Sequence, residues 1–182
     1  MAKYGKLAGK ILELLANGFL LGFVRDRSER RKLLEDSDKI WHTLDRKVLH
    51  ALLARLRLSG YIKILSQSGG REKISLTALG RRRHLAYKLY HLKLSSKKRW
   101  DKKWRIVLFD IPEAQRKIRD ALRKKLKELG FLEFQKSVFI FPYPCEDEIN
   151  FVINFFGLSD HVYYLEAPIA PDDIFRRSFQ LR

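Results

Sequence analysis

The order of strand and helix signals in the C-terminal half of this sequence limits its fold more than any other feature. β-prone apolar runs lie at residues 104–109, 132–134, 137–141 and 161–166, and helix signals lie at 112–130 and 146–156. The pair Pro112-Glu113 favours the start of the first helix, and Gly130 favours its end. The predicted order is therefore β-α-β-β-α-β.

This order is typical of the ferredoxin-like fold, in which one antiparallel four-stranded sheet carries both helices on the same face. The first helix is expected to pack on the sheet through one side, formed by Ala114, Ile118, Ala121, Leu122 and Leu126. The opposite face of the sheet then needs a cover, and pairing with a second copy is a frequent solution. We therefore expect a homodimer formed through this domain, with only a short tail after Glu166.

Shorter elements precede this domain. Helical spacing of apolar residues predicts helices over 11–15, 28–38 and 43–58, and predicted strands at 61–65 and 73–77 flank a Ser-Gly-Gly-Arg turn. A fourth helix follows from about Thr77, and its His84–Leu94 part lies between the basic runs Arg81–Arg83 and Lys97–Arg99. The elements are short and closely spaced, as in a small helical domain with a hairpin.

Three helices, a hairpin with a basic glycine-rich tip and the sequence Leu-Thr-Ala-Leu-Gly at 76–80 resemble the winged helix-turn-helix of bacterial regulators. The whole chain is therefore expected to be α+β. A winged helix-turn-helix with a linker helix occupies residues 1–99, and the ferredoxin-like domain with its tail occupies residues 100–182.

The positive charge of the chain is concentrated in its N-terminal half. Residues 1–99 carry 24 basic and 8 acidic side chains, whereas residues 100–182 carry 14 and 13. A basic module of this kind favours a polyanionic partner, and double-stranded DNA is the first candidate. Cys145 is the one cysteine, which excludes an internal disulfide and fits a cytoplasmic protein. Lys10 and Glu13 interrupt the apolar N-terminal stretch, so no membrane segment is expected.

In a winged helix the third helix enters the major groove, and the hairpin contacts the DNA backbone or the minor groove. Arg and Lys neutralise phosphates, Arg can form two hydrogen bonds with a guanine edge, and glycine permits close approach. The candidate DNA-binding residues are Thr43, Arg46, Lys47, His50, Arg57, Gly70, Arg71, Lys73, Arg81 and Arg82. The alternative is that these charges only solvate exposed surfaces.

The segment RIVLFDIPEAQRKIRDALRKKLKELGFLEFQKSVFIFP at residues 105–142 resembles the middle domain of the PaaX-like repressors of phenylacetate degradation. The resemblance lies in the Phe-Asp-Ile-Pro-Glu motif, the spaced arginines and the Gly-Phe pair. With the winged helix, it covers about residues 5–166. It implies a transcriptional repressor. In the homodimer expected from the open sheet face, two winged helices would read a palindromic DNA site, and no cofactor is expected.

The same middle domain is similar to the small CRISPR-associated nuclease Cas-two, in which an Asp at a strand end precedes the first helix, as Asp110 does here. This similarity implies an alternative, in which Asp110 and its copy across a dimer axis hold magnesium for phosphodiester cleavage. Phe109, where the nucleases often have Tyr, and the dipole of the following helix both favour a structural Asp110 instead. A further alternative is a DNA scaffold that works with a CRISPR adaptation integrase. Its backbone contacts would be Arg116, Arg119, Arg123 and Lys127.

Overall fold

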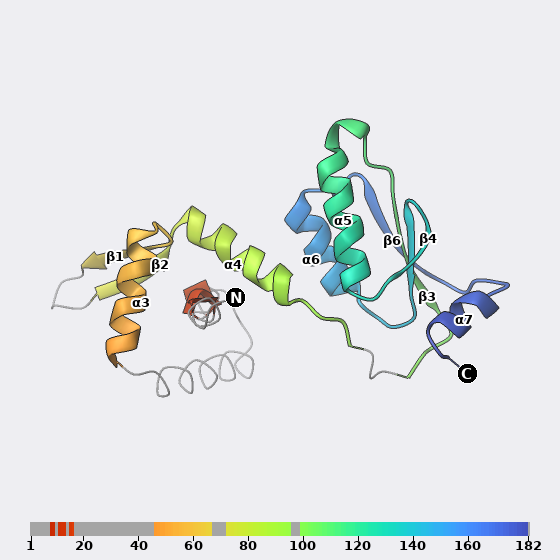
Figure 1. Cartoon of the computed structure of the whole chain (residues 1–182), viewed down its shortest axis with the longest axis horizontal. Coiled ribbons are helices and arrows are strands. Elements are labelled where there is room, and N and C mark those ends of the chain that lie inside the picture. The colour runs from red at the N-terminus through yellow and green to blue at the C-terminus, as the bar shows by residue number, and fades with distance from the viewer. Residues whose placement is uncertain are drawn as a thin grey trace, which may run out of the picture. The chain divides into compact units, whose positions relative to one another are not determined.

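The computed structural model describes residues 8–9, 11–13, 15–16, 46–66, 72–95 and 99–181 (Figure 1). The chain forms two compact units, Met1–Tyr90 and His91–Arg182, which we call unit 1 and unit 2. This division lies slightly before the expected domain boundary after residue 99. Within the described ranges, no helix has both the length and the apolar character needed to cross a membrane.

Helix α3 (Arg46–Leu58) contributes one side to the core of unit 1. Its apolar side contributes Leu52 and Leu56 to a buried cluster, whose other members are Ile11, Leu12 and Ile62. The leucines share one side because residues three or four positions apart lie above one another on a helix. Gly60 follows with φ of +70°, a backbone conformation that favours glycine, and ends the helix as predicted.

A hairpin follows α3. Strands β1 (Ile62–Ser66) and β2 (Glu72–Leu76) pair in antiparallel register, with Ile62 opposite Leu76. The predicted third helix and the two predicted strands are therefore confirmed. The hairpin tip at 67–71 and the helix predicted over 28–38 lie outside the described residues.

Helix α4 (Ala78–His91) begins directly after the hairpin, and the Thr77 hydroxyl accepts a 3.0 Å hydrogen bond from the amide of Gly80. Such a bond satisfies an amide that has no partner within the first turn of a helix. The predicted start near Thr77 is confirmed, and Arg81–Arg83 lie within the first turns of α4. The predicted end at Leu94 is wrong. Leu94 is only partly buried, so little packing holds a further turn.

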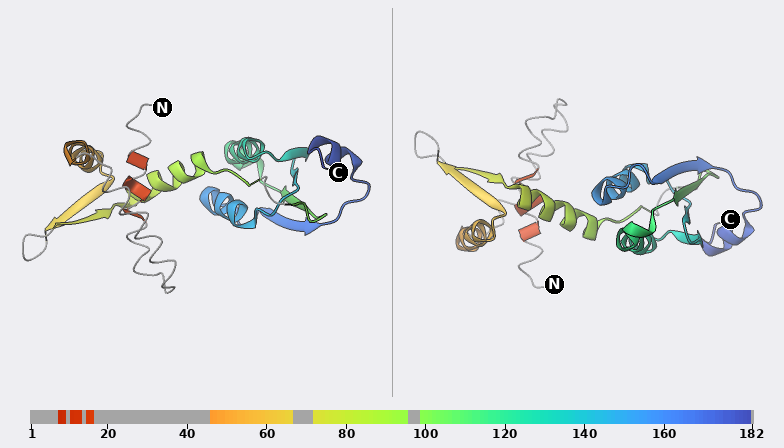
Figure 2. Two further views of the ribbon diagram at one scale, coloured as in Figure 1. Left: turned by 90° about the horizontal axis from the view of Figure 1, so that it is seen from below. Right: turned by 90° about the horizontal axis from the view of Figure 1, so that it is seen from above.

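Unit 2 contains one antiparallel sheet with the strand order β4-β5-β3-β6. The strands are β3 (Trp104–Phe109), β4 (Leu132–Gln135), β5 (Val138–Phe141) and β6 (Val162–Ala167). The helices are α5 (Arg116–Glu128), which follows a 3-10 turn at Glu113–Gln115, α6 (Glu146–Phe156) and α7 (Asp173–Ser178). Helices α5 and α6 lie on one side of the sheet and α7 on the other (Figure 2). The predicted strands and the first two helices are confirmed, and the unit is α+β.

The face of the sheet under α5 and α6 holds the core of unit 2. Val107 of β3 lies opposite Phe139 of β5, and both are fully buried. Paired residues on neighbouring strands point to the same face, so this row continues to Tyr164 of β6. From the helices, Leu122, Leu126 and Val152 complete this core and are almost without exposure.

Helix α5 turns a different side to the sheet from the predicted one. Leu122 and Leu126 are buried as expected, but Ala114 and Ala121 are exposed and Ile118 is 36% exposed. Lys125 is buried instead, and its ammonium lies 3.7 Å from a carboxylate oxygen of Glu128. The prediction fails because a lysine can bury its methylene groups while its charged end stays paired. An alanine gains less from burial, because its side chain is one methyl group.

The other face of the sheet is partly covered by α7. Phe175 of this helix forms a buried cluster with Trp104 and Ile140. The sequence does not predict α7, because one apolar aromatic in six residues gives no helical period. Next to the covered part, Tyr163 and Leu165 of β6 stay 54% and 48% exposed. The open face of the sheet is therefore half covered by the chain itself.

Candidate nucleic-acid interface

The surface of α3 that faces away from the buried cluster is exposed and basic. The cationic or titratable side chains on it are Lys47, His50, Arg55 and Arg57. Helix α3 contains no acidic residue, so no carboxylate within the helix offsets this charge. Three of the predicted DNA-binding residues thus share one exposed helix surface. Arg55 was not predicted, although its charge and its place in the same helix would have identified it.

The remaining predicted contacts of α3 and the hairpin are only partly placed. Arg46 is the first residue of α3, and Lys73 lies in β2 opposite Leu65. The side chains of these two residues lie outside the described part of the chain, as do Thr43, Gly70 and Arg71. Lys63 of β1 is exposed and was not predicted. The alternation of β1 would have identified it, because the neighbours of a buried strand residue point away from the core.

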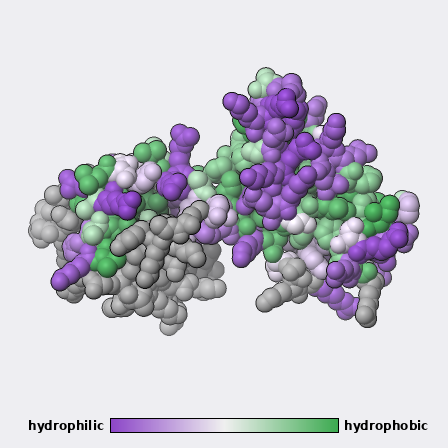
Figure 3. Space-filling view, in the orientation of Figure 1, coloured by the Kyte–Doolittle hydropathy of each residue, from purple (hydrophilic) through white to green (hydrophobic). Residues whose placement is uncertain are grey.

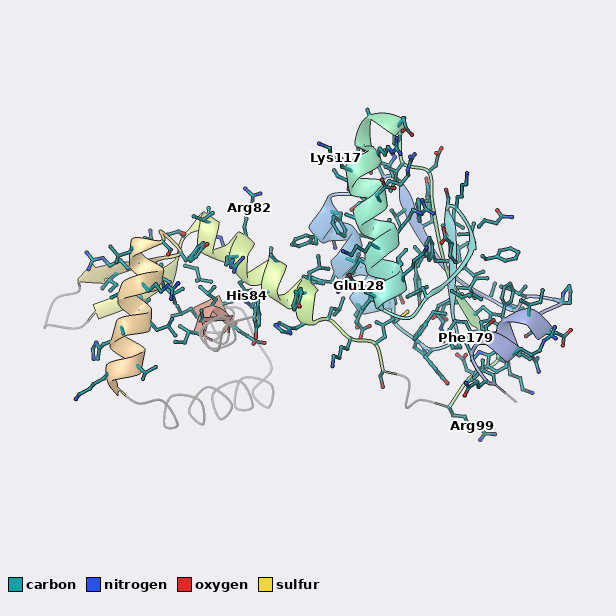
Figure 4. All side chains as sticks on the ribbon, in the orientation of Figure 1. Arg82, His84, Arg99, Lys117, Glu128 and Phe179 are labelled. Atoms are coloured by element: carbon teal, nitrogen blue, oxygen red, sulfur yellow. The ribbon has the colours of Figure 1, made fainter. Side chains whose placement is uncertain are left out.

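The arginines at the start of α4 differ in their contacts within unit 1. The guanidinium of Arg81 donates a 3.3 Å hydrogen bond to the carbonyl oxygen of Leu76, next to the hairpin. Arg82 is exposed and extends away from the helix (Figure 4). Burial lowers the pKa of His84, against the opposing effect of Glu13, so its imidazole is neutral at pH 7. Of these residues, Arg82 is the one best placed to meet a phosphate.

Four cations of α5 that were predicted as backbone contacts are paired within unit 2. The pairs are Arg116 with Glu113 and Asp120, Arg119 with Glu113, Arg123 with Glu133, and Lys127 with Glu133. The hydrogen bonds from Lys127 and Arg123 lower the pKa of Glu133, so this carboxylate is ionised at neutral pH. Hydrophilic side chains cover the visible side of α5 (Figure 3), and the helix carries seven basic and two acidic residues. Helix α5 differs from α3 in the pairing of its cations, because four of them already have carboxylate partners within unit 2.

Asp110 follows β3 directly and is exposed, and its backbone amide donates a 2.9 Å hydrogen bond to the carbonyl oxygen of His161. Among the described residues, no three His, Cys, Asp or Glu side chains gather into a group that could hold a metal ion. Magnesium is bound through oxygen ligands in near-octahedral geometry, and one carboxylate supplies a single anchor. Within the described part of a single chain the residues therefore do not fit a magnesium site, and the paired-Asp110 hypothesis requires a second copy of the chain.

Comparison with known protein families gives a match within unit 2. Residues 97–174 match the family described as the PaaX protein central Cas2-like domain. The match includes the whole sheet, helices α5 and α6, and Asp110. No curated protein sequence matches this chain. The family match therefore lies within unit 2, where residues 97–174 are similar to the PaaX protein central Cas2-like domain.

Proposed function

We propose that this protein is a cytoplasmic transcriptional regulator that binds double-stranded DNA, a repressor of the PaaX-like type. The observation that carries the proposal is the exposed basic surface of α3, which contains no acidic residue. Such a surface attracts phosphates, and its arginines can also bond guanine edges in the major groove. The family match of residues 97–174 supports the regulator class, because this domain is named for the PaaX protein.

In this proposal unit 1 is a winged helix. Helix α3 is the recognition helix and the hairpin of β1 and β2 is the wing. The order α3, β1, β2, α4 supports this role. So does the antiparallel pairing of the two strands, in which Ile62 lies opposite Leu76 and Ser66 opposite Glu72.

Unit 2 is the pairing domain in this proposal, with ferredoxin-like topology. The strand order β4-β5-β3-β6, with α5 and α6 on one side of the sheet, supports this topology. The half-exposed Tyr163 and Leu165 on the open face supply apolar surface for a second copy. A twofold dimer would present two winged helices to a palindromic site.

Selection of binding sites from a random duplex library tests this function. The full chain is used at moderate salt with magnesium present, and the recovered DNA is examined for cleavage. Enrichment of an intact palindrome is the expected result. Weak or no enrichment, despite tight and salt-sensitive binding, would contradict the regulator and favour a scaffold for a CRISPR adaptation integrase.

A nuclease is the second candidate, because Asp110 is exposed directly after the first strand of a Cas2-like domain. Cleavage of the recovered DNA that requires magnesium and disappears in Asp110→Ala would establish this function. Intact DNA, with equal binding by wild type and Asp110→Ala, would leave Asp110 with a structural role at the start of the following helix.

A further inference from the structure

The exposed surface of α3 has an apolar centre. Residues 47, 51, 54 and 58 follow one another at intervals of four, three and four, so they form one stripe along the helix. Three members of this stripe are apolar: Ala51 and Ala54 are exposed, and Leu58 is 89% exposed. The stripe lies opposite the buried Leu52 and Leu56, and unit 1 therefore does not cover it.

Long polar side chains border this apolar stripe on both sides. His50 and Arg57 lie along one border and Arg55 along the other, and all three are exposed. In a groove of DNA, side chains at the borders of a helix reach the two phosphate backbones, and those at the centre meet the base edges. The border of α3 thus suits phosphates, whereas its centre offers methyl groups.

Alanine at the centre has two consequences for base recognition. Its side chain cannot donate or accept a hydrogen bond, so Ala51 and Ala54 cannot read the polar groups of a base. Its small size also allows the helix backbone to approach the floor of the groove. The group on a base edge that matches an apolar methyl is the C5-methyl of thymine, which lies in the major groove.

We propose that Ala51 and Ala54 recognise thymine in the bound DNA through apolar contact with its C5-methyl group. This inference rests on the proposed function, which brings α3 into the major groove. It adds a preference for thymine that the charges of α3 do not provide, because arginine bonds guanine edges and phosphate contacts carry no sequence information. Arg55 and Arg57 would then supply affinity, and the alanines would supply part of the specificity.

Uracil provides the test, because it pairs like thymine and lacks only the C5-methyl group. The duplex recovered by selection is resynthesised with deoxyuridine in place of thymidine, one position at a time, and binding of the full chain is measured. At one or two positions in each half-site, the uracil duplex should bind about fourfold more weakly, the loss that corresponds to one buried methyl-sized group. Other positions should show no change.

Glycine variants connect this loss to the two alanines. In Ala51→Gly or Ala54→Gly, the thymine-to-uracil affinity ratio should fall to about one at the position that each residue contacts. The ratio is taken within one variant, so a general loss of helix stability cancels. Ala121→Gly is the matched control, because Ala121 is an exposed alanine of α5 and its loss should leave every ratio unchanged.

Two results would contradict thymine recognition by Ala51 and Ala54 without contradicting the proposed regulator function. One is a selected site at which uracil binds as well as thymine at every position. The other is a ratio that persists in both glycine variants of α3. If selection enriches no sequence at all, the proposed function itself fails, and this inference fails with it.

Discussion

The backbone amide of Gly80 donates a 3.0 Å hydrogen bond to the hydroxyl of Thr77, and that hydroxyl donates in turn to the carbonyl oxygen of Gly60 at 2.5 Å. The amide of Thr77 also donates to the carbonyl oxygen of Tyr61 at 3.0 Å. One threonine therefore joins the end of α3, the start of the hairpin and the first turn of α4. Within unit 1, the exposed surface of α3 is thereby held in a fixed position relative to the hairpin.

Gly80→Ala should destabilise unit 1 by about 3 kcal/mol. An added Cβ atom would lie 1.9 Å from the carbonyl oxygen of Tyr61, and no side-chain rotation can relieve a clash with the backbone. Hydrogen exchange of the α4 amides in the full chain measures the loss. Leu79→Ala is the control, because its side chain is 51% exposed and its change should stay within about 0.5 kcal/mol. Equal protection of α4 in both variants would contradict the prediction.

Phe175→Ala should destabilise unit 2 by about 3 kcal/mol. Phe175 is buried, and its ring centroid lies 5.5 Å from that of Trp104. Urea denaturation followed by tryptophan fluorescence measures the stability, and the emission of the chain, to which Trp104 contributes with Trp41 and Trp100, should shift to longer wavelength as Trp104 becomes exposed. The control is Ile174→Ala on the same helix, because Ile174 is 66% exposed. An unchanged midpoint and spectrum in Phe175→Ala would show that α7 does not cover the sheet in solution.

The elements that the sequence predicts well are those with their own local signals. The β3 run is β-prone and apolar apart from Arg105, and α6 is bounded by prolines on one side and by Gly157 with φ of +67° on the other. Helix α7 has no such signal. Its burial depends on Trp104, which is far away in sequence, and on the hydrogen bond from the Trp104 indole to Asp172. Tertiary contacts of this kind have no period that a sequence pattern can reveal.

In the candidate interface, too, local features could be predicted from the sequence and features that depend on tertiary contacts could not. Charge and helical spacing place Lys47, His50 and Arg57 on one surface of α3, because both properties are local. The cations of α5 have similar spacing, yet their role depends on partners. Arg123 bonds Glu133 of β4, a residue on another element, and no helix pattern predicts that pair. A cation is thus predictable from the sequence, but its neutralisation is not.

The stability of unit 2 should depend on pH through Asp101 and Arg105. Arg105 is 2% exposed and donates hydrogen bonds of 2.5 and 2.7 Å to the two carboxylate oxygens of Asp101. These bonds lower the pKa of Asp101 from 3.8 to about 2. Because the folded pKa lies below the unfolded one, the contribution is complete above about pH 4 and is lost as the pH falls towards 2.

Asp101→Asn measures this contribution. The variant should be less stable than wild type by about 1 kcal/mol at pH 6, a value reduced for solvent screening because the carboxylate is 43% exposed. Near pH 2 the difference should fall to a small part of its value at pH 6, because Asp101 is then about half protonated in the folded protein and almost fully protonated in the unfolded one. Urea denaturation at both pH values provides the comparison, with Asp160→Asn as the exposed control. A difference that stays constant between pH 6 and pH 2 would contradict the assigned pKa.

Two arginine variants distinguish α3 from α5 as the DNA-binding surface. Arg57→Ala should weaken duplex binding and reduce the slope of log affinity against log salt by about 1, because an exposed cation of α3 is lost. Arg123→Ala should leave affinity and slope unchanged, because the guanidinium of Arg123 is held by Glu133 at 2.5 Å. Each variant removes one positive charge, so a difference between them cannot come from net charge. Affinity measured over a range of salt concentrations decides the point. If Arg123→Ala lowers the slope and Arg57→Ala does not, the DNA lies on α5, as the scaffold function requires.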